Sequence, residues 1–107
     1  MMPKYLYKVS YSADGMRGVM KEGAASRADF IGKLVSNLGG QMESFHFAFG
    51  ETDVYVINEL PDDATAAAVA MAVGAAGTGS IETVKLLTPG EVDAARAIDT
   101  GYRAPGS

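Results

Sequence analysis

The residues best suited to chemistry lie close together in the stretch FHFAFGETDVYVI at 45–57. His46 is the one histidine of the chain. A strand histidine acts as a general base, serves as a single axial ligand, or simply satisfies its own hydrogen bonds. Asp53 and Tyr55 are two positions apart, so on a strand their carboxylate and phenol point the same way. These three are the candidate catalytic residues, and Ile57 would line a ligand-binding wall beside them.

A second set of residues is suited to binding the anionic or aromatic part of a ligand. Lys21 and Arg27 flank Gly23, where the helical pattern is interrupted, and either cation would pair with an anionic group. Tyr7 belongs to an alternating row of tyrosines on the first predicted strand, and such a row forms a stacking wall. Each residue also has a simpler interpretation, as a solvated charge on a helix or as a tyrosine packed in a core or interface.

The composition excludes several classes of function. The 107 residues carry a net charge of -4 with nine scattered basic residues, which disfavours nucleic-acid binding. One histidine and no cysteine exclude disulfides, thiolate catalysis and two-histidine or cysteine metal sites, so we predict no metal and no cofactor. The apolar stretch at 64–76 is too short to span a membrane. We expect a soluble cytoplasmic protein with a single domain at 1–99 and a flexible tail at 100–107.

Apolar periodicity and turn residues predict four strands along the chain. They also predict a long helical segment between the first two strands. The predicted strands lie at 4–11, 42–49, 54–60 and 80–87. Residues 16–38 keep helical spacing, with Asp14 as the candidate N-cap and Ser26 as the cap of a restart after Gly23. One kinked helix and two short helices fit this segment equally well.

The second helical segment is unusually rich in small apolar residues. It begins at Pro61, has an acidic first turn, and runs to Gly74 or Gly77. Its faces are apolar almost all round, so we expect part of it to meet another subunit. A short further helix follows Thr88, its candidate N-cap, because proline occupies the first helical position.

Residues 50–53, with the sequence Gly-Glu-Thr-Asp, predict a tight turn between the two central strands. We expect Phe49 to pair with Val54 across this turn. Phe47 then pairs with Val56, and all four side chains share the core face. The opposite face would carry Ser44, His46, Ala48, Tyr55, Ile57 and Glu59.

The predicted element order is β-α-β-β-α-β, which indicates an α+β, ferredoxin-like fold with a four-stranded antiparallel sheet and two helices on one face. The other face of such a sheet would remain too apolar for exposure to water. A second copy packed sheet to sheet would cover it. We therefore predict a homodimer, or a multiple of dimers, in the form of a dimeric α/β barrel with a pocket in each protomer.

Several stretches resemble the GYD family of small bacterial and archaeal proteins. They are LPDDATAAAVAMAV after FAFGETDVYVI, with KEGAASR upstream and VKLLTPGEVDAA downstream, and the resemblance extends from Tyr5 to about Ala95. The name motif of the family has a glycine followed closely by Tyr-Asp; Gly50 and Asp53 match it, and Thr52 stands in place of the tyrosine. The resemblance implies the dimeric α+β barrel but no reaction, because related barrels include monooxygenases, lactone isomerases and haem-handling enzymes.

Three functions fit these observations. The favoured hypothesis is a module that binds a small hydrophobic or aromatic metabolite in the pocket. The alternative is a cofactor-independent isomerase or monooxygenase with His46 or Asp53 as the base and Arg27 or Tyr55 stabilising an oxyanion. A structural or regulatory oligomerisation domain is the third possibility.

Overall fold

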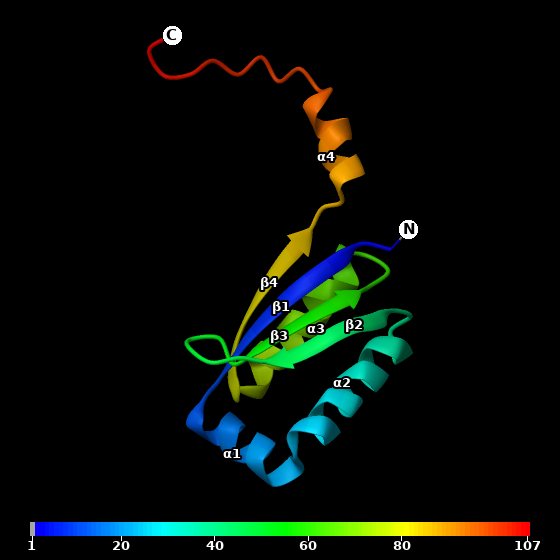
Figure 1. Ribbon diagram of the computed structural model, residues 1–107, viewed down its shortest axis with the longest axis vertical. Coiled ribbons are helices and arrows are strands. Elements are labelled where there is room, and N and C mark those ends of the chain that lie inside the picture. The colour runs from blue at the N-terminus through cyan, green and yellow to red at the C-terminus, as the bar shows by residue number, and fades with distance from the viewer. Residues whose placement is uncertain (1) are drawn as a thin grey trace.

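A computed structural model describes residues 2–107 and has an α+β architecture (Figure 1). The elements in chain order are β1 (Lys4–Tyr11), α1 (Ala13–Glu22), α2 (Ala24–Asn37), β2 (Gln41–Phe47), β3 (Val54–Glu59), α3 (Asp63–Ala76), β4 (Gly79–Leu86) and α4 (Pro89–Arg96). The strands form one antiparallel sheet in the order β2-β3-β1-β4. The predicted ferredoxin-like arrangement is therefore confirmed in outline, with one helix added at the first crossover and one at the C-terminal end.

The first helical segment is two helices, and both predicted N-caps were wrong. Ser12 caps α1, because its hydroxyl accepts a hydrogen bond from the backbone N–H of Gly15. Gly23, at φ +98°, separates the helices and precedes α2 without a side-chain cap. Asp14 and Ser26 instead lie inside the first turns. A glycine at positive φ interrupts the helix at Gly23 itself, so α2 begins directly after it. Ser26, three residues later, therefore lies inside α2 and does not cap it.

The hairpin keeps its predicted faces but not its predicted register. Phe47, not Phe49, pairs with Val54, and Phe45 pairs with Val56. Residues 48–53 form a longer connection, and Phe49 within it is fully exposed. The pairing is shifted by two residues. Because strand side chains alternate between the faces with a period of two, the side chains predicted to face the helices in each strand still do so.

The two faces of the sheet differ in what covers them. We call the face toward α2 and α3 the covered face and the other the open face. The covered face and the helices share one buried apolar cluster: Tyr5, Tyr7, Val35, Val54, Val56, Leu60 and Ala66. The register places on the open face Lys4, Leu6, Lys8, His46, Tyr55, Ile57, Glu59, Glu82 and Val84.

Helix α4 and the residues after it extend away from the sheet (Figure 1). The predicted N-cap is confirmed, since Thr88 and Glu91 form a reciprocal capping box. Exposed apolar side chains are found along this arm, at Val92, Ile98 and Tyr102, and also at Leu87 just before α4. Within residues 2–107, no helix has the length and apolar character needed to cross a membrane.

Candidate functional site

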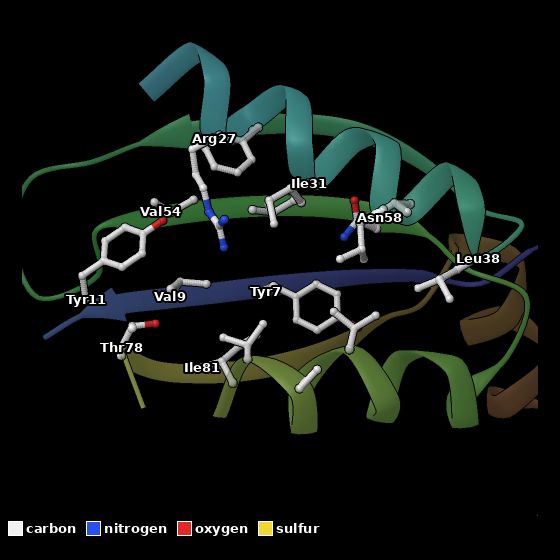
Figure 2. A pocket seen from close by; sticks show the side chains of 18 of the residues that line it. Tyr7, Val9, Tyr11, Arg27, Ile31, Leu38, Val54, Asn58, Thr78 and Ile81 are labelled. Atoms are coloured by element: carbon white, nitrogen blue, oxygen red, sulfur yellow. The ribbon is translucent and has the colours of Figure 1, made fainter. Parts of the chain in front are cut away.

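A cavity of about 310 Å³ lies between α2, α3 and the covered face of the sheet (Figure 2). Most of its lining is aliphatic or aromatic, and every strand contributes. The lining includes Tyr7, Tyr11, Arg27, Asn58, Ala68 and Ala72. A volume near the lower end of the range for small-molecule sites, about 300–1,000 Å³, suits a compact ligand.

Small side chains on α3 keep this space open. Ala68 and Ala72 line the cavity from α3, where a larger residue would reach toward α2. Asp62 caps the start of α3, because its carboxylate accepts a hydrogen bond from the Thr65 backbone N–H at 2.8 Å, and Gly77 caps its end in the left-handed conformation at φ +73°. The helix begins two residues after the predicted start at Pro61 and ends at Gly77, the later of the two predicted ends. The alanine-rich sequence thus gives a well-capped helix that does not fill the layer beneath it.

Tyr7 lies in the floor of the cavity with its hydroxyl already engaged. The phenol donates a hydrogen bond to the backbone carbonyl of Ala66, at 2.8 Å, and its side chain is buried. Burial raises the pKa of Tyr7 to about 12. The group therefore stays neutral near pH 7 and contributes an aromatic surface.

Asn58 is the one buried polar side chain of the described residues, and it lines the cavity. Its exposed fraction is 2%, and its Oδ1 atom has no hydrogen-bond partner. Leaving a buried acceptor unpaired costs about 1–3 kcal/mol. An amide in such a place needs an explanation, because buried polar groups are normally paired.

Arg27 brings the only charged side chain among the lining residues. Its guanidinium extends from α2 toward the interior of the cavity (Figure 2). The Nη1 atom is 3.8 Å from Glu22 Oε1, beyond hydrogen-bond distance, and the guanidinium carbon lies 5.2 Å from the Phe30 ring centre. Burial raises the pKa of the nearby Tyr11 phenol, and the positive charge of Arg27 partly opposes this rise. This end of the cavity therefore combines a cation with a neutral phenol.

The structure separates the residues predicted from the sequence into two groups. Tyr7 and Arg27 line the cavity, whereas the other five do not. His46 and Tyr55 are direct cross-strand partners on the open face, and Ile57 lies on the same face.

The remaining two residues lie elsewhere. Asp53 accepts a hydrogen bond from the Tyr11 backbone N–H at 2.8 Å, and its own N–H donates to the Val9 carbonyl, so it ties the hairpin connection to β1. Lys21 is exposed in the last turn of α1.

Sequence analysis missed Asn58, although a signal for it was present. Side chains of β3 point alternately to the two faces of the sheet. The buried face that holds Val54 and Val56 also holds Asn58 and Leu60. A polar residue at a core position of an otherwise apolar face indicates either a buried hydrogen bond or a binding site.

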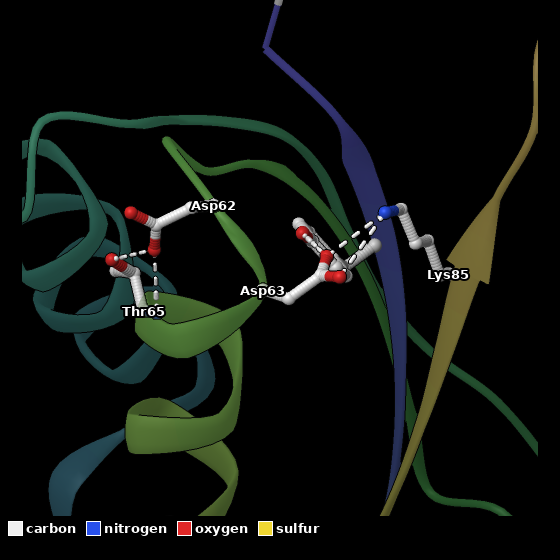
Figure 3. Close-up of polar contacts among 5 residues, drawn as sticks. Asp62, Asp63, Thr65 and Lys85 are labelled. Atoms are coloured by element: carbon white, nitrogen blue, oxygen red, sulfur yellow. Dashed lines mark hydrogen bonds and ion pairs between the residues drawn. The ribbon is translucent and has the colours of Figure 1, made fainter.

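A second polar cluster lies where α3 begins, outside the cavity lining (Figure 3). The Tyr5 phenol donates to Asp63, and Lys85 Nζ lies 3.0 Å from Asp63 Oδ1. The hydrogen bond from Tyr5, followed by that from Lys85, lowers the pKa of Asp63. Burial, followed by the neighbouring Asp63, raises the pKa of Tyr5 to about 12. This cluster joins α3 to β1 and β4.

No group of three or more His, Asp or Glu side chains within residues 2–107 is placed to hold a metal ion.

Comparison with known proteins gives one match. The family model of the GYD domain matches residues 5–95, which is most of the chain. No curated protein and no solved structure matches.

Proposed function

The chain belongs to the GYD domain family, and we propose that it binds a small, predominantly apolar molecule in the cavity between α2 and α3. The observation that carries the proposal is the cavity itself, an apolar space of ligand size between two well-formed helices. The space is partly open to water, since Ala68 and Ala72 of its lining are exposed, and an apolar hollow that water can enter is typical of a small-molecule site.

Apolar contact alone limits the affinity. Burying about 300 Å² of apolar ligand surface contributes roughly 7–8 kcal/mol. Association costs subtract from this figure, so at most about micromolar binding is expected from the apolar wall. Tighter binding would require the polar groups of the site.

A neutral fluorescent probe tests the proposal. N-phenyl-1-naphthylamine brightens in apolar surroundings and carries no charge, so it reports on the cavity without engaging Arg27 electrostatically. We expect saturable binding to the unmodified protein and binding at least about tenfold weaker in Ala72→Phe, which places a ring at a lining position. Ala67→Phe, an exposed position of the same helix outside the lining, is the matched control. Equal probe affinity in both variants would refute the proposal.

We further propose that the protein is a homodimer joined through its open faces, as a dimeric α/β barrel. The open face has an apolar centre at Leu6, Tyr55 and Ile57, of which Tyr55 is 37% exposed. Lysines and glutamates surround this centre, so the face carries both charge signs and is suited to pairing with itself. The exposed apolar residues of the C-terminal arm add further surface for a partner copy.

Sedimentation at several concentrations tests the dimer. The unmodified chain should sediment at twice its mass of 11.1 kDa. Ile57→Asp, which places a charge in the apolar centre, should sediment as a monomer, whereas Thr83→Asp, an exposed residue on the covered side of β4, should remain dimeric. If the protein dissociates on dilution and stays folded, it does not act chiefly as an oligomerisation domain.

One observation favours a catalytic second candidate. His46 and Tyr55 are cross-strand neighbours, and a second copy on the open face would enclose them in a drier site. There His46 would act as a base on an enolisable substrate, as in a cofactor-independent isomerase. The measurement is substrate-dependent hydrogen exchange in D₂O, which His46→Gln should abolish while the dimer persists. Exchange at an equal rate in His46→Gln would remove this candidate.

A further inference from the structure

We infer that the ligand of the α2–α3 cavity is an amphipathic carboxylic acid, with its anionic group at Arg27, an apolar body along the sheet, and a hydrogen-bond donor at Asn58. The inference rests on the proposed function, because it names the class of molecule that the same cavity would bind. Two polar side chains at different places along an otherwise apolar lining carry it.

Asn58 supplies the first argument. Its Oδ1 atom is buried and unpartnered, while the neighbouring phenol of Tyr7 is satisfied within the protein. A leucine in place of Asn58 would keep its branched shape and avoid the penalty of an unpaired acceptor. The unpaired atom becomes favourable once a bound molecule donates an O–H or N–H to it. Asn58 therefore indicates a ligand with a hydroxyl or amide hydrogen at this position.

Arg27 supplies the second argument. It is the only charged lining residue, it is about one-third exposed, and its ion-pair partner Glu22 lies 3.8 Å away, beyond hydrogen-bond distance. The local positive charge of Arg27 favours anions over cations in the cavity, although the chain as a whole has a net charge of -4. A guanidinium presents parallel N–H donors that match a carboxylate, and the Tyr11 phenol lies beside it as a further donor.

The spacing of the two polar groups defines the shape of the ligand. Asn58 lies toward the Leu38 end of the cavity, and Tyr11, Thr78 and the Arg27 guanidinium lie toward the other end (Figure 2). Along β3 the distance from Val54 to Asn58 is four residues, or about 13 Å. The wall between them is apolar. An elongated molecule with one aromatic ring or a short alkyl chain between its two polar ends fits this arrangement.

Calorimetric titration with three related probes tests the inference. The probes are 3-(4-hydroxyphenyl)propanoate, 3-phenylpropanoate without the hydroxyl, and 4-propylphenol without the carboxylate. The first should bind the unmodified protein most tightly. Arg27→Met should weaken both carboxylates about tenfold or more and leave 4-propylphenol unchanged. Asn58→Leu should weaken the two hydroxylated probes several-fold and leave 3-phenylpropanoate unchanged.

Controls separate this inference from the proposed function. Lys33→Met removes an exposed charge from α2, the helix that also carries Arg27, and should leave the affinity for all three probes unchanged. A melting temperature of empty Asn58→Leu at or above that of the unmodified protein shows that the asparagine is not kept for folding; a much lower value overturns its assignment to a ligand.

The remaining outcomes are distinct. If all three probes bind with equal affinity and Arg27→Met changes none of them, the ligand class is wrong but the apolar cavity site stands. If neither these probes nor the neutral fluorescent probe binds, the proposed function fails and this inference with it. Probe binding that weakens as protein concentration rises would identify another chain as the occupant and would also overturn the inference.

Discussion

The covered and open faces belong to the same four strands and yet differ in chemistry. The covered face has buried tyrosines and valines, a cavity, and in Asn58 a buried acceptor without a partner. The open face carries exposed ion pairs, such as Lys8 Nζ and Glu82 Oε2 at 3.5 Å, around a small apolar centre. This difference is the basis of both proposals, ligand binding in the cavity of the covered face and dimerisation through the open face.

The largest expected contrast between the faces is in packing. Leu60 is fully buried in the cluster of the covered face, whereas Leu6 is half-buried on the open face. Leu60→Ala should lower the free energy of unfolding by about 2–5 kcal/mol, and Leu6→Ala by less than about 1.5 kcal/mol, as measured by urea denaturation. A cost for Leu6→Ala that rises with protein concentration would support a second copy on the open face. Equal costs at low concentration would contradict the difference between the faces.

The next largest effect concerns the unpaired amide. Asn58→Leu should raise the free energy of unfolding of the empty protein by about 1–3 kcal/mol, because it removes a buried acceptor without a partner. Glu59→Leu, the neighbouring position with its side chain on the open face, is the control and should change stability by less than about 0.5 kcal/mol. Urea denaturation of both variants without ligand gives the comparison. Destabilisation by Asn58→Leu would show that the amide supports the fold.

The fold was largely predictable because its signals are local. Alternation in β1 and β3, the capping residues Asp62 and Thr88, and the break at Gly23 depend on residues close in sequence. The hairpin register was not predictable to the residue. Nothing in residues 48–53 distinguishes a four-residue from a six-residue connection, and either choice leaves the faces unchanged.

The cavity could be predicted only in part. Arg27 and Tyr7 were selected from local patterns, and both line it. Its existence depends on how far α2 lies from α3, which is set by side-chain packing between segments distant in sequence. Asn58 could not be predicted in the same way, because an amide does not titrate and becomes informative only once its burial and its missing partner are known.

A smaller effect should appear at alkaline pH. The folded-state pKa of Tyr7, about 12, lies above its ordinary value of 10, so below pH 10 the stabilisation from the protonated phenol is fully present. Between pH 10 and 12 the unfolded chain loses this proton first, and stability falls by at most about 1.4 kcal/mol per pH unit. Tyr7→Phe should reduce that slope, because it removes the group whose pKa is raised. Urea denaturation from pH 9 to pH 12 measures the slope, and an unchanged slope in Tyr7→Phe would contradict the burial of its phenol.

The smallest expected effects come from the ion pairs, which again differ between the faces. Lys8→Met removes an exposed pair of the open face and should change the free energy of unfolding by less than about 1 kcal/mol, mainly at low salt. On the covered side, the lowered pKa of Asp63 gives stability that is present above the ordinary carboxyl range and is lost as the pH falls through the folded-state pKa.

Tyr5→Phe removes the first cause of that lowering, so the acid limb of its stability curve should be shallower below pH 4 than that of the unmodified protein. Lys8→Met should leave the acid limb unchanged, because it affects neither Asp63 nor its partners. Thermal unfolding between pH 2 and pH 7 compares the variants. If Lys8→Met flattened the acid limb as much as Tyr5→Phe does, the polar groups of the two faces would be energetically equivalent. The start of α3 would then be held to the sheet by apolar packing alone.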